Sequence, residues 1–215
     1  MIGRIKKAIF FCAHTDDEGI CAGTLHRLVR QGAEVRVCAF TTAATKEDRR
    51  GIHDEGVTEL MTEFEDSMKA LGITEYWCGG MRPSASAIQE HRQMVCQSIY
   101  NTVEVVKPDL VITLSPEDEN PAHRVIGEEC ERVMRGRVPL LWRCQYPWNY
   151  AIGKQNVFVE LSAEDVEAKR RSIQAYQSQR FRYNYEEIFM HQIRVDGLSV
   201  KVPYAEKFEL VRAVV

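Results

Sequence analysis

Apolar stretches of strand length alternate with stretches of helical periodicity along most of the chain. The run "KAIFFCA" (7–13) is apolar throughout apart from its first residue, and "DLVITLSP" (109–116) repeats this pattern later in the sequence. A short apolar run of this kind is typical of a strand buried on both faces. Further strands are predicted at 34–42, 75–79, 140–147 and 156–162.

The segments between these strands place apolar residues three or four positions apart, which predicts helices. In 19–32 the residues Ile20, Leu25 and Leu28 follow this spacing, and Gly32 is a suitable helix stop. Further helices are predicted at 57–73, 86–108, 122–136 and 163–179. Ser162 is a suitable N-cap for the last of them. The tail beyond residue 180 predicts no definite element.

Alternation of strands and helices predicts a mostly parallel sheet covered by helices on both faces, a Rossmann-like three-layer α/β fold. The chain has no repeat, low-complexity tract or linker, so we expect a single domain over 1–215. In the common strand order 3-2-1-4, the strands at 7–13 and 109–116 are neighbours where the order reverses. The loops that follow them should then meet in one ligand crevice.

Composition narrows the functional class. The chain is 45% hydrophobic and 27% charged, with a formal net charge of -3. This balance predicts neither a nucleic acid nor a membrane partner, since both favour concentrated positive charge. Seven scattered cysteines without a CxxC pair predict reduced thiols in a cytoplasmic protein. The absence of a Gly-rich phosphate loop argues against a nucleotide-binding domain.

Two polar loops follow the two central strands and carry the candidate chemistry. An imidazole and a carboxylate three positions apart, joined by a distant imidazole, suit a zinc site that keeps one position for water. A divalent cation would also offset the crowded carboxylates and leave one as a general base. The spacing alone leaves a helix-start role open, because helix dipoles also favour acidic residues. The loops contribute His14, Asp16, Asp17 and Glu18, and Asp118, Glu119, Asn120 and His123.

The segment "AHTDDEGICAGTLHRLVRQGAEVRVCAFTT" (13–42) resembles the opening of the LmbE-like/PIG-L family of zinc-dependent N-acetylglucosaminyl deacetylases, whose signature is AHPDDE. Later segments resemble landmarks of the family in the same order, so the resemblance covers essentially the whole chain. These segments are "KALGI" (69–73), "KPDLVITLSPEDENPAHR" (107–124), "KRRSIQAYQSQ" (169–179) and "PYAEKFEL" (203–210).

The resemblance implies a role for each matching residue. His14, Asp17 and His123 match the three metal ligands, and Asp16 matches the catalytic base. The implied reaction is amide hydrolysis of a small N-acetylated substrate, in which zinc-bound water, deprotonated by Asp16, attacks the acetyl carbonyl. Glu18 would support the site or start the helix. Fe²⁺ is an alternative metal, and the resemblance also suggests a homo-oligomer.

The chain departs from the family pattern at several positions. Thr15 replaces a proline, and Leu60 aligns with an arginine linked to substrate binding. Asn120 and Ala122 stand where the second motif has a histidine and its supporting aspartate. Three interpretations remain open. The chain is an active deacetylase in which Asp16 returns the proton and Asn120 stabilises the oxyanion, an amidohydrolase for another amide, or a catalytically silent binding protein.

Other residues are further candidates for the site. A histidine elsewhere could supply the missing acid, although surface roles are the simpler interpretation; the candidates are His53, His91 and His191. The aromatic residues of "QYPWNY" could form a platform for a sugar ring or simply pack, namely Tyr146, Trp148 and Tyr150. Arg180 and Arg182 could contact an anionic group. Because the three ligands and the base are all retained, we expect a zinc-dependent deacetylase for a sugar or sugar conjugate.

Overall fold

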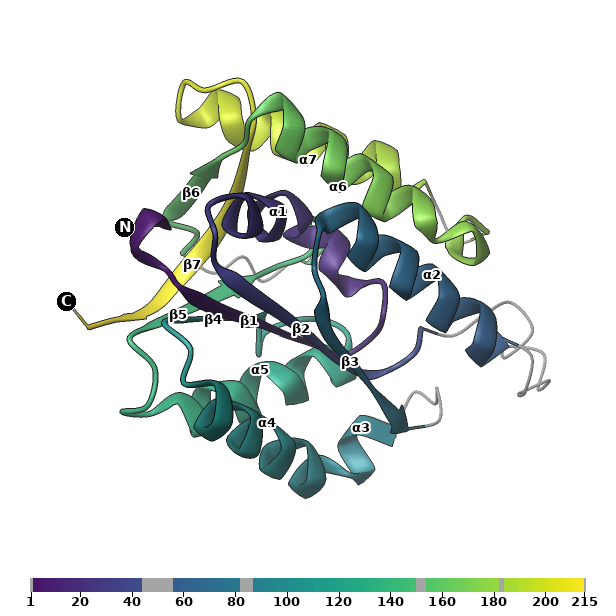
Figure 1. Ribbon diagram of the computed structural model, residues 1–215, viewed down its shortest axis with the longest axis vertical. Helices are drawn as coiled ribbons and strands as arrows, with labels where there is room; N and C mark the ends of the chain where they lie inside the picture. Colours follow the sequence, from purple (N-terminus) through teal and green to yellow (C-terminus); the bar gives the residue numbers. More distant parts are fainter. Residues whose placement is uncertain (1, 44–55, 82–86, 150–153, 182–183, 215) are drawn as a thin grey trace.

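A mostly parallel sheet forms the middle layer of the part of the chain that the computed structural model describes, residues 2–43, 56–81, 87–149, 154–181 and 184–214. Its seven strands run in the order β3-β2-β1-β4-β5-β7-β6 (Figure 1). The first five strands of the chain pair in parallel, whereas β7 is antiparallel to β5 and β6 to β7. The strands are β1 (Lys7–Cys12), β2 (Glu34–Thr41), β3 (Glu75–Met81), β4 (Leu110–Leu114), β5 (Leu140–Cys144), β6 (Val157–Glu160) and β7 (Ala205–Ala213).

Helices cover both faces of this sheet, so the predicted three-layer α/β fold is confirmed (Figure 1). One face carries α1 (Ala22–Arg30), α2 (Gly56–Leu71), α6 (Ala163–Ala175) and α7 (Tyr185–Ser199). The other carries α3 (Ala87–Glu90), α4 (Arg92–Val106) and α5 (Pro121–Met134). Short 3-10 turns are η1 (Ile2–Arg4), η2 (Asp17–Ile20) and η4 (Gln177–Gln179).

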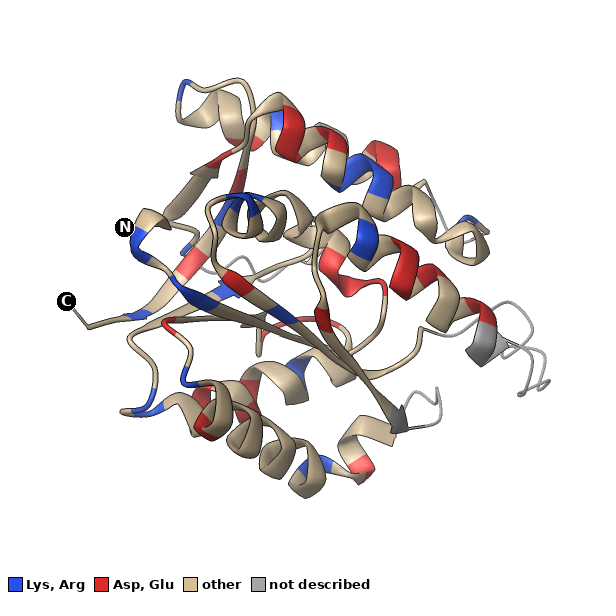
Figure 2. Cartoon of the chain, viewed as in Figure 1, with Lys and Arg blue, Asp and Glu red and all other residues tan. Residues whose placement is uncertain are grey.

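The outer helices carry charges of both signs. Figure 2 shows acidic and basic positions interspersed along them, as the mixed composition implies. None of the helices in the described ranges combines the length and the apolar character that a bilayer span requires. All seven cysteines are free thiols, and five of them are buried.

The sequence prediction differs from the structure mainly near the first motif and in the tail. The helix predicted at 19–32 starts as the 3-10 turn η2 and continues as α1 after Cys21, whose φ of -125° is not helical. The long helix predicted at 86–108 divides at His91 into α3 and α4. The tail forms α7 and β7, which the sequence did not predict. β7 is fully buried only near its start, so it lacks the regular alternation of a half-buried strand.

The central strands β1 and β4 are adjacent, as predicted, with Phe11 opposite Thr113. Both strands are buried along almost their whole length, because helices cover them on both sides. Their carboxyl ends lie at the same edge of the sheet, where the strand order reverses. The loops that follow, beginning at Ala13 and Ser115, are therefore brought to one place.

A buried ion pair from the C-terminal part of the chain secures the start of α1. Glu206 accepts hydrogen bonds from the backbone N–H groups of Gly23 (3.0 Å) and Thr24 (2.7 Å), which have no partner within the helix. Lys169 Nζ lies 2.7 Å from Glu206 Oε1 and donates to the backbone oxygens of Gly19 and Ile20. Both charged side chains are nearly inaccessible to solvent. The pair thus joins η2 and α1 to α6 and β7.

We predict that Lys169→Met lowers the free energy of unfolding by about 3–5 kcal/mol, because it leaves Glu206 as a buried charge without its cation. Urea denaturation followed by circular dichroism measures this change. The matched control is Lys69→Met, which removes an exposed ion pair with Asp66 and should leave stability unchanged within error. Equal effects of the two substitutions would contradict the prediction.

Candidate metal centre

The loops after β1 and β4 bring together the three side chains predicted as metal ligands. His123 Nε2 lies 3.3 Å from His14 Nδ1 and 3.2 Å from Asp17 Oδ1. The three ligand atoms of this group all lie within 4.8 Å of one another. Residues more than one hundred positions apart in the sequence therefore form one cluster at the edge of the sheet.

This donor set fits a divalent cation. Zinc binds imidazole nitrogen and carboxylate oxygen at distances of about 2.0–2.2 Å, and tetrahedral geometry then separates neighbouring ligand atoms by about 3.3 Å. The two shortest distances within the cluster match that separation. Two imidazoles and one carboxylate also suit Fe²⁺ or another first-row metal. Within the described part of the chain, the candidate ligand group contains His14, Asp17 and His123 but not Asp16.

Asp17 is held in place through both of its carboxylate oxygens. Oδ2 accepts hydrogen bonds from the backbone N–H groups of Ala13 (3.0 Å) and His14 (2.8 Å). Oδ1, which faces His123, accepts a hydrogen bond of 2.6 Å from the hydroxyl of Tyr146. Burial alone would raise the pKa of Asp17, but the imidazoles of His123 and His14 outweigh it and hold the pKa well below its usual range. Asp17 is therefore ionised, as a ligand must be.

His123 is oriented from behind by a second carboxylate. Its Nδ1 lies 3.2 Å from Asp118 Oδ2, and Asp118 is itself held by the Asn149 side chain (2.8 Å) and the Asn120 backbone N–H (2.8 Å). Burial would lower the pKa of His123, but Asp17 and Asp118 outweigh it and raise the pKa to about 10. A carboxylate behind a ligating imidazole fixes its orientation and raises its basicity.

Asn120 is the N-cap of α5, and this role sets the direction of its amide. Its Oδ1 accepts a hydrogen bond from the Ala122 backbone N–H (2.9 Å), so Nδ2 turns towards His123 Nε2 at 3.3 Å. The side-chain amide therefore presents a donor to the cluster.

Gly127 lets α5 approach β4 closely, because a Cβ atom there would lie 2.6 Å from the Leu114 backbone oxygen.

The other two acidic residues of the first motif have different surroundings. Asp16 is half-buried at the start of η2, and its side chain makes no capping hydrogen bond there. Glu18 is fully buried and accepts hydrogen bonds from Ser67 (2.5 Å) and Tyr176 (2.6 Å). Burial raises the pKa of Glu18 to about 8, which these hydrogen bonds only partly oppose. Glu18 thus ties the motif to α2 and to Tyr176, the residue that follows α6.

Three of the residues that depart from the family pattern are buried, and the structure shows their local contacts. Thr15 is buried, its hydroxyl accepts from the Ala43 backbone N–H (3.3 Å), and its carbonyl accepts from Tyr176. Leu60 is buried in the apolar side of α2. Ala122 is buried in the first turn of α5, and Asp118 is the carboxylate that lies 3.2 Å from His123 Nδ1.

The other histidines and arginines considered above that the structure describes do not join the cluster. His26 lies 2.8 Å from Asp165 and has a structural role, while His91, His191 and Arg180 are exposed. Three further candidates lie outside the described residues, namely His53, Tyr150 and Arg182.

Sequence reasoning missed the specific roles of Asp118 and Tyr146. Tyr146 both donates to Asp17 and stacks on His123, with ring centroids 5.2 Å apart. Tyr146 also stacks with Trp148, whose ring centroid is 4.6 Å away and which is 38% exposed. The aromatic run "QYPWNY" was the available signal, but the partners of Tyr146 depend on the tertiary fold.

Comparisons with known proteins agree with this fold. The chain is similar to N,N'-diacetylchitobiose deacetylase from Pyrococcus horikoshii, with 20% identity, a TM-score of 0.74, and coverage of 97% of this chain and 84% of that chain. The zinc-inhibited form of teicoplanin deacetylase Orf2 matches with 15% identity, a TM-score of 0.74, and coverage of 94% and 96%. The 4-carboxy-2-hydroxymuconate hydratase GalB from Pseudomonas putida KT2440 matches with 15% identity, a TM-score of 0.76, and coverage of 98% of each chain.

Identities this low show a shared fold, and the presence of a hydratase among these structures means that the fold alone does not define the reaction. The family comparison is more specific. A model described as PIG-L, GlcNAc-PI de-N-acetylase, matches residues 9–134, which include both motif loops and all three clustered side chains. The chain belongs to the PIG-L family.

Proposed function

We propose that this protein is a metal-dependent hydrolase that removes an acetyl group from the amide nitrogen of an amino sugar or sugar conjugate. The observation that carries the proposal is the convergence of His14, Asp17 and His123 in a chain of the PIG-L family. The deacetylases among the similar structures favour the same reaction class. The retained Asp16 gives the site a carboxylate that is not part of the ligand group.

The residues divide the work of amide hydrolysis among them. A divalent cation, zinc in the simplest case, would be held by His14, Asp17 and His123 and would supply Lewis acidity towards a water molecule and an acyl carbonyl. Asp16 accepts the proton of the attacking water and returns it to the leaving amine, so that acetate and a free amine result. Asn120 Nδ2 donates a hydrogen bond to the carbonyl oxygen as negative charge develops there.

One observation favours a second candidate, a catalytically silent member that binds the same kind of ligand. Asn120 and Ala122 occupy the positions of the family's second-motif histidine and aspartate, so this loop offers no imidazole to protonate the leaving amine. The active interpretation requires Asp16 to serve as both base and acid. Measurement of acetate release separates the two candidates.

We predict that the purified protein releases acetate from at least one member of a panel of N-acetylated amino sugars and their glycosides. Chelation should abolish turnover and added Zn²⁺ should restore it. Asp16→Asn should lower kcat by about 10²–10⁴-fold while leaving the metal content unchanged, because it removes only the proton acceptor. Asp66→Asn, an exposed carboxylate on α2, is the control. A stoichiometric metal without turnover on any N-acyl amide would favour the silent candidate.

Asn120→Ser separates the capping role of this residue from its role as a donor. Serine caps helices about as well as asparagine, but it lacks the amide donor directed at the cluster. We predict a fall in kcat of about 10²–10³-fold, the usual effect of losing one oxyanion donor, with little change in thermal stability. The same substitution at Asn184, the N-cap of α7, should change neither quantity. Unchanged kcat in Asn120→Ser would remove this residue from the mechanism.

Asp118→Asn tests the carboxylate behind His123. We predict a loss of about 10–100-fold in metal affinity, measured by competition with a chromophoric chelator, because the imidazole loses both its orientation and part of its basicity. Glu117→Gln, an exposed carboxylate in the same loop, should leave the affinity unchanged. If both variants bind the metal as tightly as the native protein, Asp118 does not position the ligand.

A further inference from the structure

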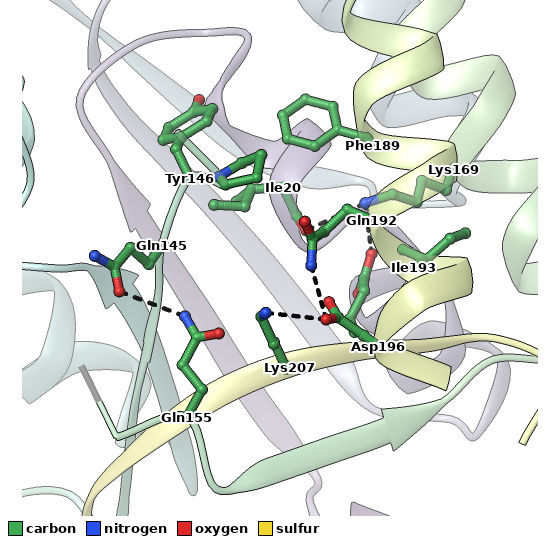
Figure 3. A pocket seen from close by; sticks show the side chains of 12 residues that line it. Ile20, Gln145, Tyr146, Gln155, Lys169, Phe189, Gln192, Ile193, Asp196 and Lys207 are labelled. Atoms are coloured by element: carbon green, nitrogen blue, oxygen red, sulfur yellow. Dashed lines mark hydrogen bonds and ion pairs between the residues drawn. The ribbon is translucent and has the colours of Figure 1, made fainter. Parts of the chain in front are cut away.

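A cavity lies beyond the carboxyl end of β5, between that strand, β7 and α7 (Figure 3). The volume of this cavity is about 60 Å³. Its floor includes the Lys169–Glu206 pair that secures η2 and α1, and Tyr146 forms part of its wall. Among the described polar side chains that line it, Tyr146 also belongs to the metal centre, where its hydroxyl holds Asp17, whereas the mechanism proposed above uses none of the others.

The charges that line the cavity cancel in pairs. Lys169 Nζ lies 2.7 Å from Glu206, and Lys207 Nζ lies 3.0 Å from Asp196. Gln192 donates a further hydrogen bond of 2.7 Å to Asp196, as Figure 3 shows. Among the described residues that line the cavity, each ionic group thus already faces its counter-charge. A charged ligand would lose its hydration without gaining a free partner, and this favours a neutral occupant.

Among the buried polar atoms of the described lining residues, one has no hydrogen-bond partner within the protein. The Gln155 side chain donates through Nε2 to Gln145 Oε1 (3.4 Å), which leaves its own Oε1 as a buried acceptor without a hydrogen bond. In Figure 3 this oxygen lies on the side of Gln155 that faces Lys207 and the cavity. A buried acceptor costs free energy until a donor reaches it. Because this oxygen is an acceptor, any group that reaches it, whether a water molecule or a ligand hydroxyl, must donate the hydrogen bond.

The rest of the wall and the volume limit the occupant further. Carbon-rich side chains also line the cavity, so the occupant has C–H groups as well as a hydroxyl; they include Ile20, Tyr146, Phe189 and Ile193. A single water needs roughly 10–15 Å³ of cavity volume, so this cavity holds roughly four to six water-sized positions. That is the size of a three-carbon polyol.

We propose that this cavity is a binding site for a neutral, hydroxyl-bearing molecule of about the size of glycerol, with Gln155 Oε1 as its hydrogen-bond acceptor. The site is distinct from the metal centre and does not rest on the function proposed for that centre. Because its walls include Lys169, Glu206 and Tyr146, an occupant contacts the side chains that hold the first motif loop in place.

Side-chain amide signals of glutamine, followed by heteronuclear NMR during titration, test the proposal directly. The probes are glycerol, the glycerate anion and protonated serinol, which are of similar size but differ in charge. We expect glycerol to shift the signals of Gln145, Gln155 and Gln192 saturably, and the two ions to bind at least several-fold more weakly. Gln155→Leu should weaken glycerol binding by roughly three- to tenfold, the effect of one neutral hydrogen bond.

The matched control is Gln97→Leu on the exposed surface of α4, which should bind glycerol like the native protein. Shifts that do not saturate, or that spread over the whole surface, would overturn the proposal. Tighter binding of either ion would overturn the inference of a neutral ligand. Equal glycerol affinity in Gln155→Leu and Gln97→Leu would overturn the role of Gln155. A thermal-unfolding scan of each variant confirms that the comparison is made on folded protein.

Discussion

The buried carboxylate of Asp17 is the group on which the geometry of the metal centre depends, because its two oxygens have separate tasks. Oδ2 is anchored by two backbone N–H groups of its own loop, and Oδ1 is held by Tyr146 opposite His123. The carboxylate therefore cannot rotate away from the imidazoles. A negative charge buried in this way requires positive partners, and the imidazoles of His123 and His14, which meet at 3.3 Å, lie beside it and lower its pKa.

The C-terminal third of the chain provides the frame for this arrangement. Lys169 of α6 and Glu206 of β7 satisfy the backbone groups at the junction of η2 and α1, and Tyr176 reaches Glu18 and the Thr15 carbonyl. The later sequence landmarks thus act on the first motif, although they lie more than 140 positions further along the chain. Preorganisation of this kind holds the three clustered side chains in place.

The sequence predicted the parallel core, the meeting of the two loops and the three clustered side chains, because buried strands and a motif are local signals. It did not predict α7, β7 or the partners of Tyr146. A buried lysine such as Lys169 contradicts the usual preference of its residue type, so only the fold reveals the burial. The sequence likewise did not predict the pairing of Asp118 with His123, because this contact depends on how the loop turns before α5.

The most direct test of this account is anomalous X-ray diffraction from crystals of the protein grown with Zn²⁺. The account predicts one strong peak within about 2.0–2.2 Å of His14 Nδ1, a carboxylate oxygen of Asp17 and His123 Nε2. A fully occupied zinc site elsewhere, or zinc bound by only one of the two imidazoles, would contradict it.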